Sequence, residues 1–203
     1  FGMIRTGTRI IDANGNELEN HPNLSQFSTI DNFVLDWFAG KSALYMCSLV
    51  YNRDYLIDVG GIVSKKDLWH DVVAEVKLAS KYPVAEILPT KASFRIHRGN
   101  RGSAVKMLDW ADDSLYLLDV ICDVVQDKEL IRKQGMLYFC KINYRFIKKD
   151  IRSPLERLRL YFAVSKMFDH CYSPLNLFAR SARTRLGLMR RKLFGYKPLP
   201  KRT

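Results

Sequence analysis

The sequence predicts an α/β fold in which a body of strands mixed with helices is followed by a helical extension. Strand-like and helix-like segments alternate in the first half of the chain, and the pattern is helical from about residue 104 onward. The composition, 47% apolar and 27% charged over 203 residues, is that of a globular protein with a real core. We therefore predict a body at residues 1–125 and a basic, all-helical extension at residues 126–203.

Apolar stretches bounded by turn residues predict the strands. Residues 4–11 form the first strand, which ends at an Asn-Gly turn, and the polar stretch 17–29 is expected to be a loop. Residues 44–50 are apolar between polar neighbours, which predicts a buried strand. Two further strands are expected at residues 83–88 and 93–97.

Apolar residues at helical spacing predict the helices. Those of the body are expected at residues 31–38, 54–59 (closed by Gly60-Gly61), 71–80 and 107–125, and another at 130–146. Ser153-Pro154 and Ser173-Pro174 each place a serine N-cap before a proline at the first helical position, so two more helices are expected to begin there.

Positive charge is concentrated near the C-terminus. Residues 145–203 hold 16 basic and 3 acidic residues, whereas residues 1–144 hold 17 basic and 18 acidic ones. The formal net charge of +12 therefore comes from the tail, and a basic surface over the whole protein is excluded. An anionic partner would meet the tail.

The last predicted helix has one apolar stripe, with arginines on its other faces. If it lies in a membrane interface, the acyl region would receive the stripe and lipid phosphates would contact the arginines. The alternative is that the stripe packs on the body or on a partner, and nucleic acid is not favoured because few aromatic residues accompany the charges. The expected membrane contacts are Leu175, Phe178, Leu186, Met189, Leu193, Arg183, Arg190 and Arg191.

The cysteines and the hydropathy bear on metal binding and on membrane insertion. The four cysteines have no metal-ligand spacing, so buried reduced thiols are expected. The longest apolar run, residues 43–51, is too short to span a bilayer. We expect a cytoplasmic protein, or one peripheral at the inner face of the cytoplasmic membrane.

One acidic residue opens the helix expected at residues 71–80. His70-Asp71 follows a loop that begins at the double glycine, and a carboxylate in that position can accept a proton as a general base. A carboxylate at a helix start is also a common N-cap. On spacing alone the N-cap is favoured.

The segment RIHRGNRGS, residues 95–103, gathers three arginines around two glycines. Guanidinium groups match phosphate oxygens, so Arg95, Arg98 and Arg101 are candidates to bind a diphosphate. Alternatively, this is a surface loop whose arginines pair with the acidic residues of the next helix, Asp109, Asp112 and Asp113.

In their order and spacing, these segments resemble the second half of a family 2 glycosyltransferase, an inverting enzyme with a GT-A-type fold, over residues 1–125. The motifs are RIIDANGNE at 9–17, an apolar strand, polar helix and double glycine over 43–61, WHD at 69–71, and RIHRGNRGS. The last is similar to the family pattern R-x-S/H-x-x-N-x-S.

The resemblance implies a partial GT-A-type mixed sheet and transfer of a sugar from a nucleoside-diphosphate sugar to a hydroxyl of a glycan or lipid-linked acceptor. Bacterial cell-surface polysaccharide synthesis is the implied setting, with Mg or Mn stabilising the departing diphosphate. Asp71 would be the catalytic base, with His70 beside it. Arg95, His97, Arg98, Asn100, Arg101 and Ser103 would line the diphosphate or a closing loop.

The sequence departs from the family pattern at two points. The family has two adjacent acids where this chain has His70-Asp71. The donor-binding half and its Asp-x-Asp metal motif are expected upstream of residue 1, because Asp112-Asp113 does not fit that role. We therefore expect residues 1–203 not to catalyse alone. The competing class is a non-enzymatic module whose basic arm binds an anionic polymer, a membrane surface or a partner protein.

Overall fold

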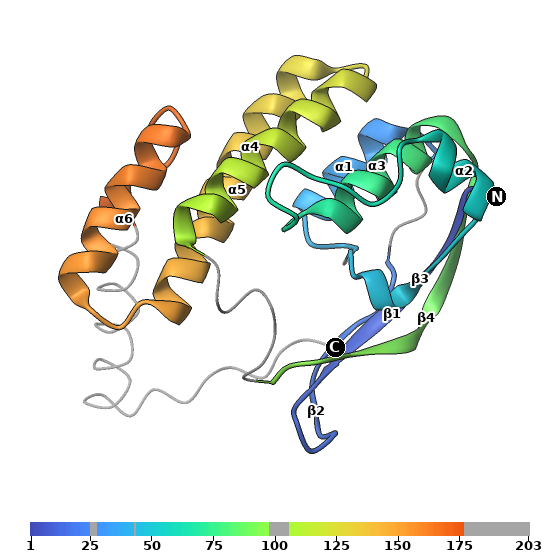
Figure 1. The fold of residues 1–203 in the computed structure, drawn as a ribbon, viewed down its shortest axis with the longest axis horizontal. Coiled ribbons are helices and arrows are strands. Elements are labelled where there is room, and N and C mark those ends of the chain that lie inside the picture. The colour runs from blue at the N-terminus through green and yellow to red at the C-terminus, as the bar shows by residue number, and fades with distance from the viewer. Residues whose placement is uncertain (25–27, 43, 98–105, 177–203) are drawn as a thin grey trace, which may run out of the picture.

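The computed structural model describes residues 1–24, 28–42, 44–97 and 106–176, and it has a four-stranded sheet with helices packed beside it (Figure 1). The strands are β1 (Met3–Ile11), β2 (Glu17–His21), β3 (Leu49–Tyr51) and β4 (Val84–Arg95). The helices are α1 (Ile30–Phe38), α2 (Arg53–Asp58), α3 (His70–Lys81), α4 (Met107–Val124), α5 (Lys128–Asp150), α6 (Pro154–Met167) and the 3-10 turn η1 (Met46–Ser48). The α/β class is confirmed.

β1 is the central strand of the sheet. It pairs in parallel with β4 along its whole length. Its other edge is shared by β3, antiparallel at Met3 to Arg5, and β2, antiparallel at Thr8 to Ile11. The sheet is therefore mixed, and the C-terminal ends of β1 and β4 lie side by side, which is the edge where open α/β sheets commonly bind ligands.

The prediction of a loop over residues 17–29 is wrong at its start, where β2 forms. β2 is exposed at four of its five positions, so it lacks the apolar alternation that marks a strand. The turn before it forms the hairpin instead. The Asp12 carboxylate accepts bonds from the backbone amides of Asn14 and Asn16 at 2.8 and 2.9 Å, and Gly15 adopts a positive φ of 93°.

β4 is one long strand where two short ones were predicted. Pro89 lacks an N–H, so its presence argues against one continuous strand. The sheet accommodates it with a register shift, in which Thr6 lies opposite Ile87 and the next residue, Gly7, lies opposite Thr90. The Thr6 hydroxyl donates to the Pro89 carbonyl at 2.7 Å, so the irregular segment stays attached to β1.

The buried strand predicted at residues 44–50 is also wrong. Its middle is the turn η1, and only Leu49 to Tyr51 pair with the beginning of β1. Val50 is 64% exposed. An apolar run can form an exposed edge segment as readily as a core strand, and the pattern alone does not distinguish them.

The helices predicted within residues 31–146 and the one expected at Ser153-Pro154 are confirmed, with their ends moved by a few residues. The helix expected at Ser173-Pro174 lies mostly outside the described residues. Asn52 caps α2 through bonds to the amides of Asp54 and Tyr55, and Gly60 and Gly61 end it with φ of 91° and 76°. The Ser153 hydroxyl accepts from the amide of Glu156 at 3.4 Å at the start of α6.

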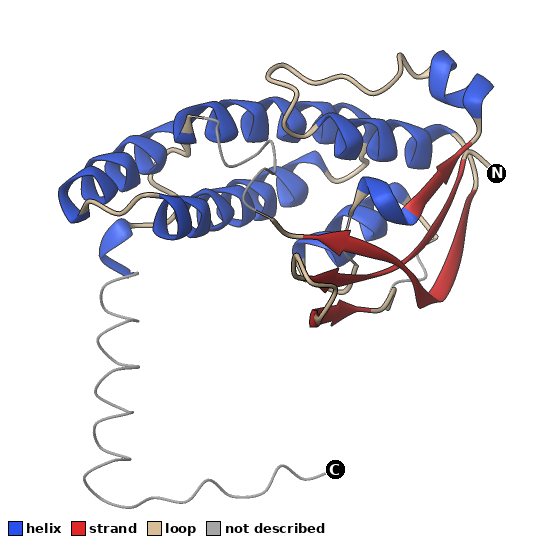
Figure 2. Cartoon of the chain, turned by 60° about the horizontal axis from the view of Figure 1, so that its bottom comes forward, coloured by secondary structure: helices blue, strands red, loops and turns tan. Residues whose placement is uncertain are grey.

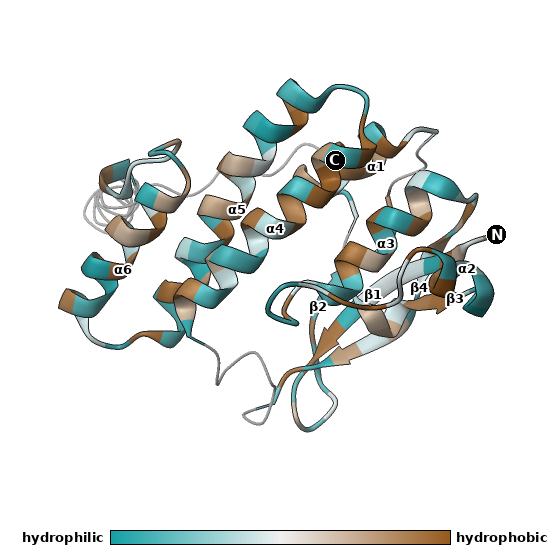
Figure 3. Cartoon of the chain, turned by 45° about the horizontal axis from the view of Figure 1, so that its top comes forward, coloured by the Kyte–Doolittle hydropathy of each residue, from teal (hydrophilic) through white to brown (hydrophobic). Residues whose placement is uncertain are grey.

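The helices form two groups. α1 and α3 cover one face of the sheet, while α4 and α5 run antiparallel and pack on α3 and α1 (Figure 2). Figure 3 shows apolar and polar segments alternating along these helices, as expected for amphipathic elements. One buried cluster extends from Met3 through Val76 and Leu117 to Phe139 and Val164. The core therefore continues across residue 125.

All four cysteines are free thiols. Cys122 and Cys140 are buried, as expected, but Cys47 and Cys171 are exposed. The expectation of four buried thiols is thus wrong for two of them.

Candidate active site

Asp71 lies in the first turn of α3 and is not the N-cap. The capping position is Trp69, whose side chain makes no capping bond, and His70 is the first helical residue. The Asp71 carboxylate accepts a bond from the adjacent amide of Val72 at 2.9 Å, and the backbone amide of Met46 also contributes a hydrogen bond to it. The N-cap interpretation is therefore wrong, and the carboxylate is not used to satisfy the amides that precede the helix.

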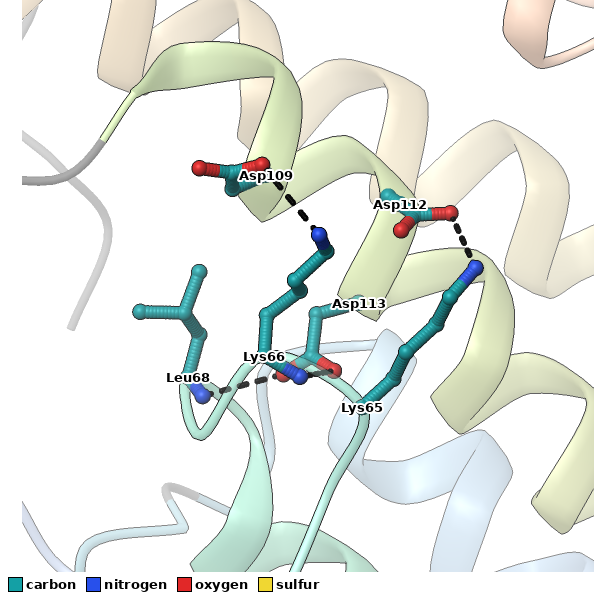
Figure 4. Close-up of polar contacts among 6 residues, drawn as sticks. All are labelled: Lys65, Lys66, Leu68, Asp109, Asp112 and Asp113. Carbon is teal, nitrogen blue, oxygen red and sulfur yellow. Dashed lines mark hydrogen bonds and ion pairs between the residues drawn. The ribbon is translucent and has the colours of Figure 1, made fainter.

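Those amides are satisfied by Asp113 of α4 (Figure 4). This carboxylate, fully buried, accepts from the backbone amides of Lys66, Leu68 and Trp69 at 2.9, 3.0 and 2.8 Å. It also accepts from the Ser64 hydroxyl at 2.7 Å. Asp113 therefore fixes the loop that precedes α3 and so positions Asp71 in its first turn.

The neighbouring acids of α4 pair with the same loop. Asp112 lies 2.8 Å from the ammonium of Lys65, and Asp109 lies 3.8 Å from that of Lys66. Asp109, Asp112 and Asp113 were considered above as partners for the arginines of residues 95–101. Within the described residues their contacts are with residues 64–69, while Arg98 and Arg101 lie outside them.

Burial determines the electrostatics of Asp71. Desolvation raises the pKa of its carboxyl above the ordinary value of 3.8, and the charge of His70 and backbone amides, that of Val72 foremost, oppose the shift. A carboxylate with a raised pKa is a better proton acceptor when it is ionised, which is the property a general base needs.

A second carboxylate lies one helical turn further along α3. Glu75 has no exposed surface, and neither of its carboxylate oxygens has a hydrogen-bond partner within the described part of the chain. Burial raises the pKa of Glu75 to about 8, partly opposed by Arg5 and reinforced by Asp71. Arg5 itself pairs with Glu86 of β4 at 3.3 Å and lies 4.7 Å from the ring centre of Phe33.

Asp71 opens into a cleft of about 1490 Å³ between the helices and the C-terminal end of β4. Aromatic rings from several elements line it: Trp37, Phe38, Tyr45, Trp69, Phe94, Trp110, Tyr138 and Phe146. The indoles of Trp37 and Trp69 meet edge to face at 6.0 Å, and those of Trp69 and Trp110 at 5.6 Å. The space exceeds the 300–1,000 Å³ or so that is usual for small-ligand sites.

The cleft also has a column of positive charge. Lys141, Arg145 and Lys149 line it from successive turns of α5. No acidic side chain of the described residues lies within ion-pair distance of these three groups. The ammonium of Lys141 lies 5.1 Å from the ring centre of Tyr172.

The expected diphosphate-binding residues fall partly within the described chain. The guanidinium of Arg95 donates to the carbonyls of Asp12 and Ala13 at 3.1 and 2.9 Å, which ties the end of β4 to the β1–β2 turn. His97 is exposed and lines the cleft. Arg98, Asn100, Arg101 and Ser103 lie outside the described residues.

The expected membrane contacts lie mostly outside the described residues as well. Leu175 is described and is 64% exposed, whereas Phe178, Arg183, Leu186, Met189, Arg190, Arg191 and Leu193 are not described. The helix expected at Ser173-Pro174 begins at residue 174, and the Ser173 hydroxyl accepts from the amide of Leu175 at 3.3 Å. Within the described ranges, no helix is long and apolar enough to cross a membrane.

A divalent metal does not fit the described residues. These contain no group of three or more His, Cys, Asp or Glu side chains placed to hold an ion. Asp71 and Glu75 are close in sequence, but the site around Glu75 is closed.

Sequence reasoning missed most of the cleft. Its aromatic residues come from β4 and four of the helices and their flanking loops, so no local pattern joins them. The cationic column had a signal that was overlooked, since Lys141, Arg145 and Lys149 are spaced by four residues and must share one face of a helix.

No family model, curated protein or solved structure matches this chain, so the site has to be interpreted from its own residues.

Proposed function

We propose that this chain is the acceptor-side part of an inverting glycosyltransferase with a GT-A-type fold, and that Asp71 is its catalytic base. The observation that carries the proposal is the placement of Asp71. Its carboxylate is half-buried in the first turn of α3, does not occupy the N-cap position, and lines a cleft large enough for a glycan or glycolipid.

The order of the elements supports the finer fold assignment. The resemblance calls for a first strand with a turn, an apolar strand followed by a helix closed by two glycines, a helix opened by an acid, and then a strand that leads into the arginine segment. In place of the apolar strand the described residues form only η1 and the short β3. β1, α2 with Gly60 and Gly61, α3 with Asp71, and β4 ending at Arg95 follow that order.

The chemistry follows from the geometry. Asp71 would take the proton of an acceptor hydroxyl as its oxygen forms a bond to the anomeric carbon of the donor. The bond from that carbon to the diphosphate breaks on the opposite face, which inverts the configuration. A divalent metal, Mg or Mn, would stabilise the diphosphate as it leaves, but the described residues supply no site for it.

The test is transfer by the complete protein, including the upstream donor half that the proposal requires. Asp71→Asn should abolish transfer of sugar from a nucleotide-sugar donor and leave donor binding intact. Asp119→Asn, which removes an exposed acid paired with Arg132 on α4, is the matched control and should transfer normally. If the two variants turned over equally, Asp71 would not be the base.

The tail favours a second role at a membrane surface. Residues 145–203 carry a balance of +13, with three acidic residues. We propose that the helix beginning at residue 174 holds the protein at an anionic inner-leaflet surface, where lipid-linked acceptors are found.

A further inference from the structure

The cationic column and the aromatic rings face the same cleft. Lys141, Arg145 and Lys149 are spaced by four residues on α5, which places them about 6 Å apart along the helix axis. The half-buried rings of Trp69 and Trp110 lie in the same cleft as Asp71, and Trp37, which is 5% exposed, packs edge to face on Trp69. A ligand that fills this space meets aromatic surface and positive charge together.

We infer that the cleft binds a glycosyl phosphate, with the sugar ring on Trp69 and Trp110 and the phosphate on Lys141, Arg145 and Lys149. That the bound glycosyl phosphate is the acceptor rests on the proposed function. That the cleft binds it does not. The inference names the acceptor class: a sugar joined to a phosphate, either free or carried on a lipid.

Charge argues for a phosphate in particular. The three cations have no acidic partner within ion-pair distance in the described ranges, and Arg145 and Lys149 are exposed. Guanidinium and ammonium groups form their strongest hydrogen bonds with such anions. Because one phosphate can accept bonds from two neighbouring cations, successive turns of α5 suit it well.

The aromatic rings argue for a sugar. Ligand sites are typically lined by aromatic side chains with a few polar groups that fix orientation. The partly exposed indoles of Trp69 and Trp110 offer a flat apolar surface, which matches the C–H face of a pyranose ring. With the phosphate on α5, a hydroxyl of that sugar can face Asp71, which lines the same space.

The three tryptophans are the only ones in the sequence, so they report on the cleft directly. The chain labelled with ¹⁵N gives three indole signals by NMR. It would be titrated with glucose 1-phosphate and with the octyl diester of glucose 1-phosphate, below the micelle concentration. Two comparison ligands are octyl glucoside, which lacks the phosphate, and uridine diphosphate, which lacks the glucose.

Glucose 1-phosphate or its octyl diester should shift at least two of the indole signals, and octyl glucoside should bind more weakly. Arg145→Gln and Lys149→Gln should each weaken phosphate binding about tenfold. Lys148→Gln is the matched control, because it removes an exposed cation from the same helix without touching the cleft lining. Tighter binding of the diester would identify a lipid-carried phosphate, and equal binding a free one.

Three results would overturn the inference. The first is equal affinity for octyl glucoside and the diester. The second is an equal loss of phosphate affinity in Lys148→Gln and Arg145→Gln. The third is the absence of any indole shift with either phosphate. A uridine diphosphate affinity above that of both phosphates would assign the cations to the donor instead. None of these measurements needs turnover, so they are independent of the transfer assay on Asp71→Asn.

Discussion

The carboxylate of Asp113 accepts a hydrogen bond from the backbone amide of Trp69 at 2.8 Å, across 44 residues of sequence. Trp69 occupies the N-cap of α3 but has no side-chain capping bond, and Asp113 of α4 binds the amide of this N-cap residue, as the third-position acid of a capping box would. The same carboxylate binds two further amides of the preceding loop. Asp113 is therefore a positioning residue for Asp71, two residues beyond Trp69.

Asp113→Ala should destabilise the protein by on the order of 3 kcal/mol, because it leaves several buried donors without an acceptor. Denaturant unfolding measures this loss. Asp112→Ala, which removes an exposed ion pair with Lys65, should cost less than about 1 kcal/mol. Equal losses in the two variants would show that the loop does not depend on Asp113.

Glu75 predicts a pH dependence of stability. Its folded pKa of about 8 lies above the ordinary 4.5, so the folded state holds a proton that the unfolded state releases between these values. Stability should therefore fall as the pH rises from about 4.5 to about 8, by at most about 1.4 kcal/mol per pH unit. One arginine, Arg5, lies between Glu75 and Glu86, and it already pairs with Glu86.

Glu75→Gln removes the ionisable group while keeping the shape of the side chain. The variant should be more stable than the parent above about pH 7, and the difference should shrink toward about pH 5. Unfolding by urea across this range gives both curves. A parent that gained stability over the same rise in pH would mean that Glu75 folds as a carboxylate paired with Arg5.

Local signals account for much of the fold. Helical spacing, Gly60-Gly61 and the Ser153-Pro154 start predicted α1 to α6, because most of these signals are local. The start of α3 is the exception, since Asp113 of α4 fixes the loop before it. The sheet was predicted less well. β2 forms because of the turn at Asp12, and β4 crosses Pro89 because β1 supports it on one side. Tertiary pairing overrides the strand pattern in both places.

The candidate site was predicted at Asp71 and His97 and missed elsewhere. Asp71 could be found because an acid opens a helix after a double glycine, but its burial comes from the surrounding fold. Trp37, Trp69 and Trp110 are far apart in sequence, and only the packing of α1, α3 and α4 brings them together. No periodicity within one segment encodes such a contact.

Gly7 tests the irregular pairing of β1. A Cβ built there would lie 2.9 Å from the carbonyl oxygen of His21, from the Cα of Pro22 and from the hydroxyl of Thr90. Gly7→Ala should therefore destabilise the protein by about 1–3 kcal/mol, since two of these atoms belong to the backbone. Gly15→Asn should cost less, about 1 kcal/mol, because the space around Gly15 is open and the cost is only the strain of a side chain at a positive φ of 93°. Thermal unfolding compares the two, and a Gly7→Ala variant as stable as the parent would contradict the close packing.

The membrane proposal is tested by flotation with liposomes that contain anionic lipids. The chain should float with these vesicles and do so less as salt is raised, because arginine contacts with lipid phosphates are screened. Leu186→Glu with Met189→Glu should abolish flotation by placing charge on the apolar stripe. Leu155→Glu is a control on α6, where the side chain is already 78% exposed. Unchanged flotation of the double variant would exclude the stripe as the contact.

At Asp71 we expect the carboxylate that serves transfer to lower the stability of the fold. Its folded pKa is raised by burial, so ionised Asp71 costs the folded state free energy at neutral pH, where the unfolded chain carries the charge at no penalty. Asp71→Asn should raise the melting temperature at pH 7 and lose this advantage as the pH falls toward the ordinary value of 3.8. The same substitution should remove transfer, because asparagine cannot accept the proton. A variant that is both inactive and less stable than the parent at neutral pH would indicate that Asp71 supports the fold, and that its burial serves packing and not proton transfer.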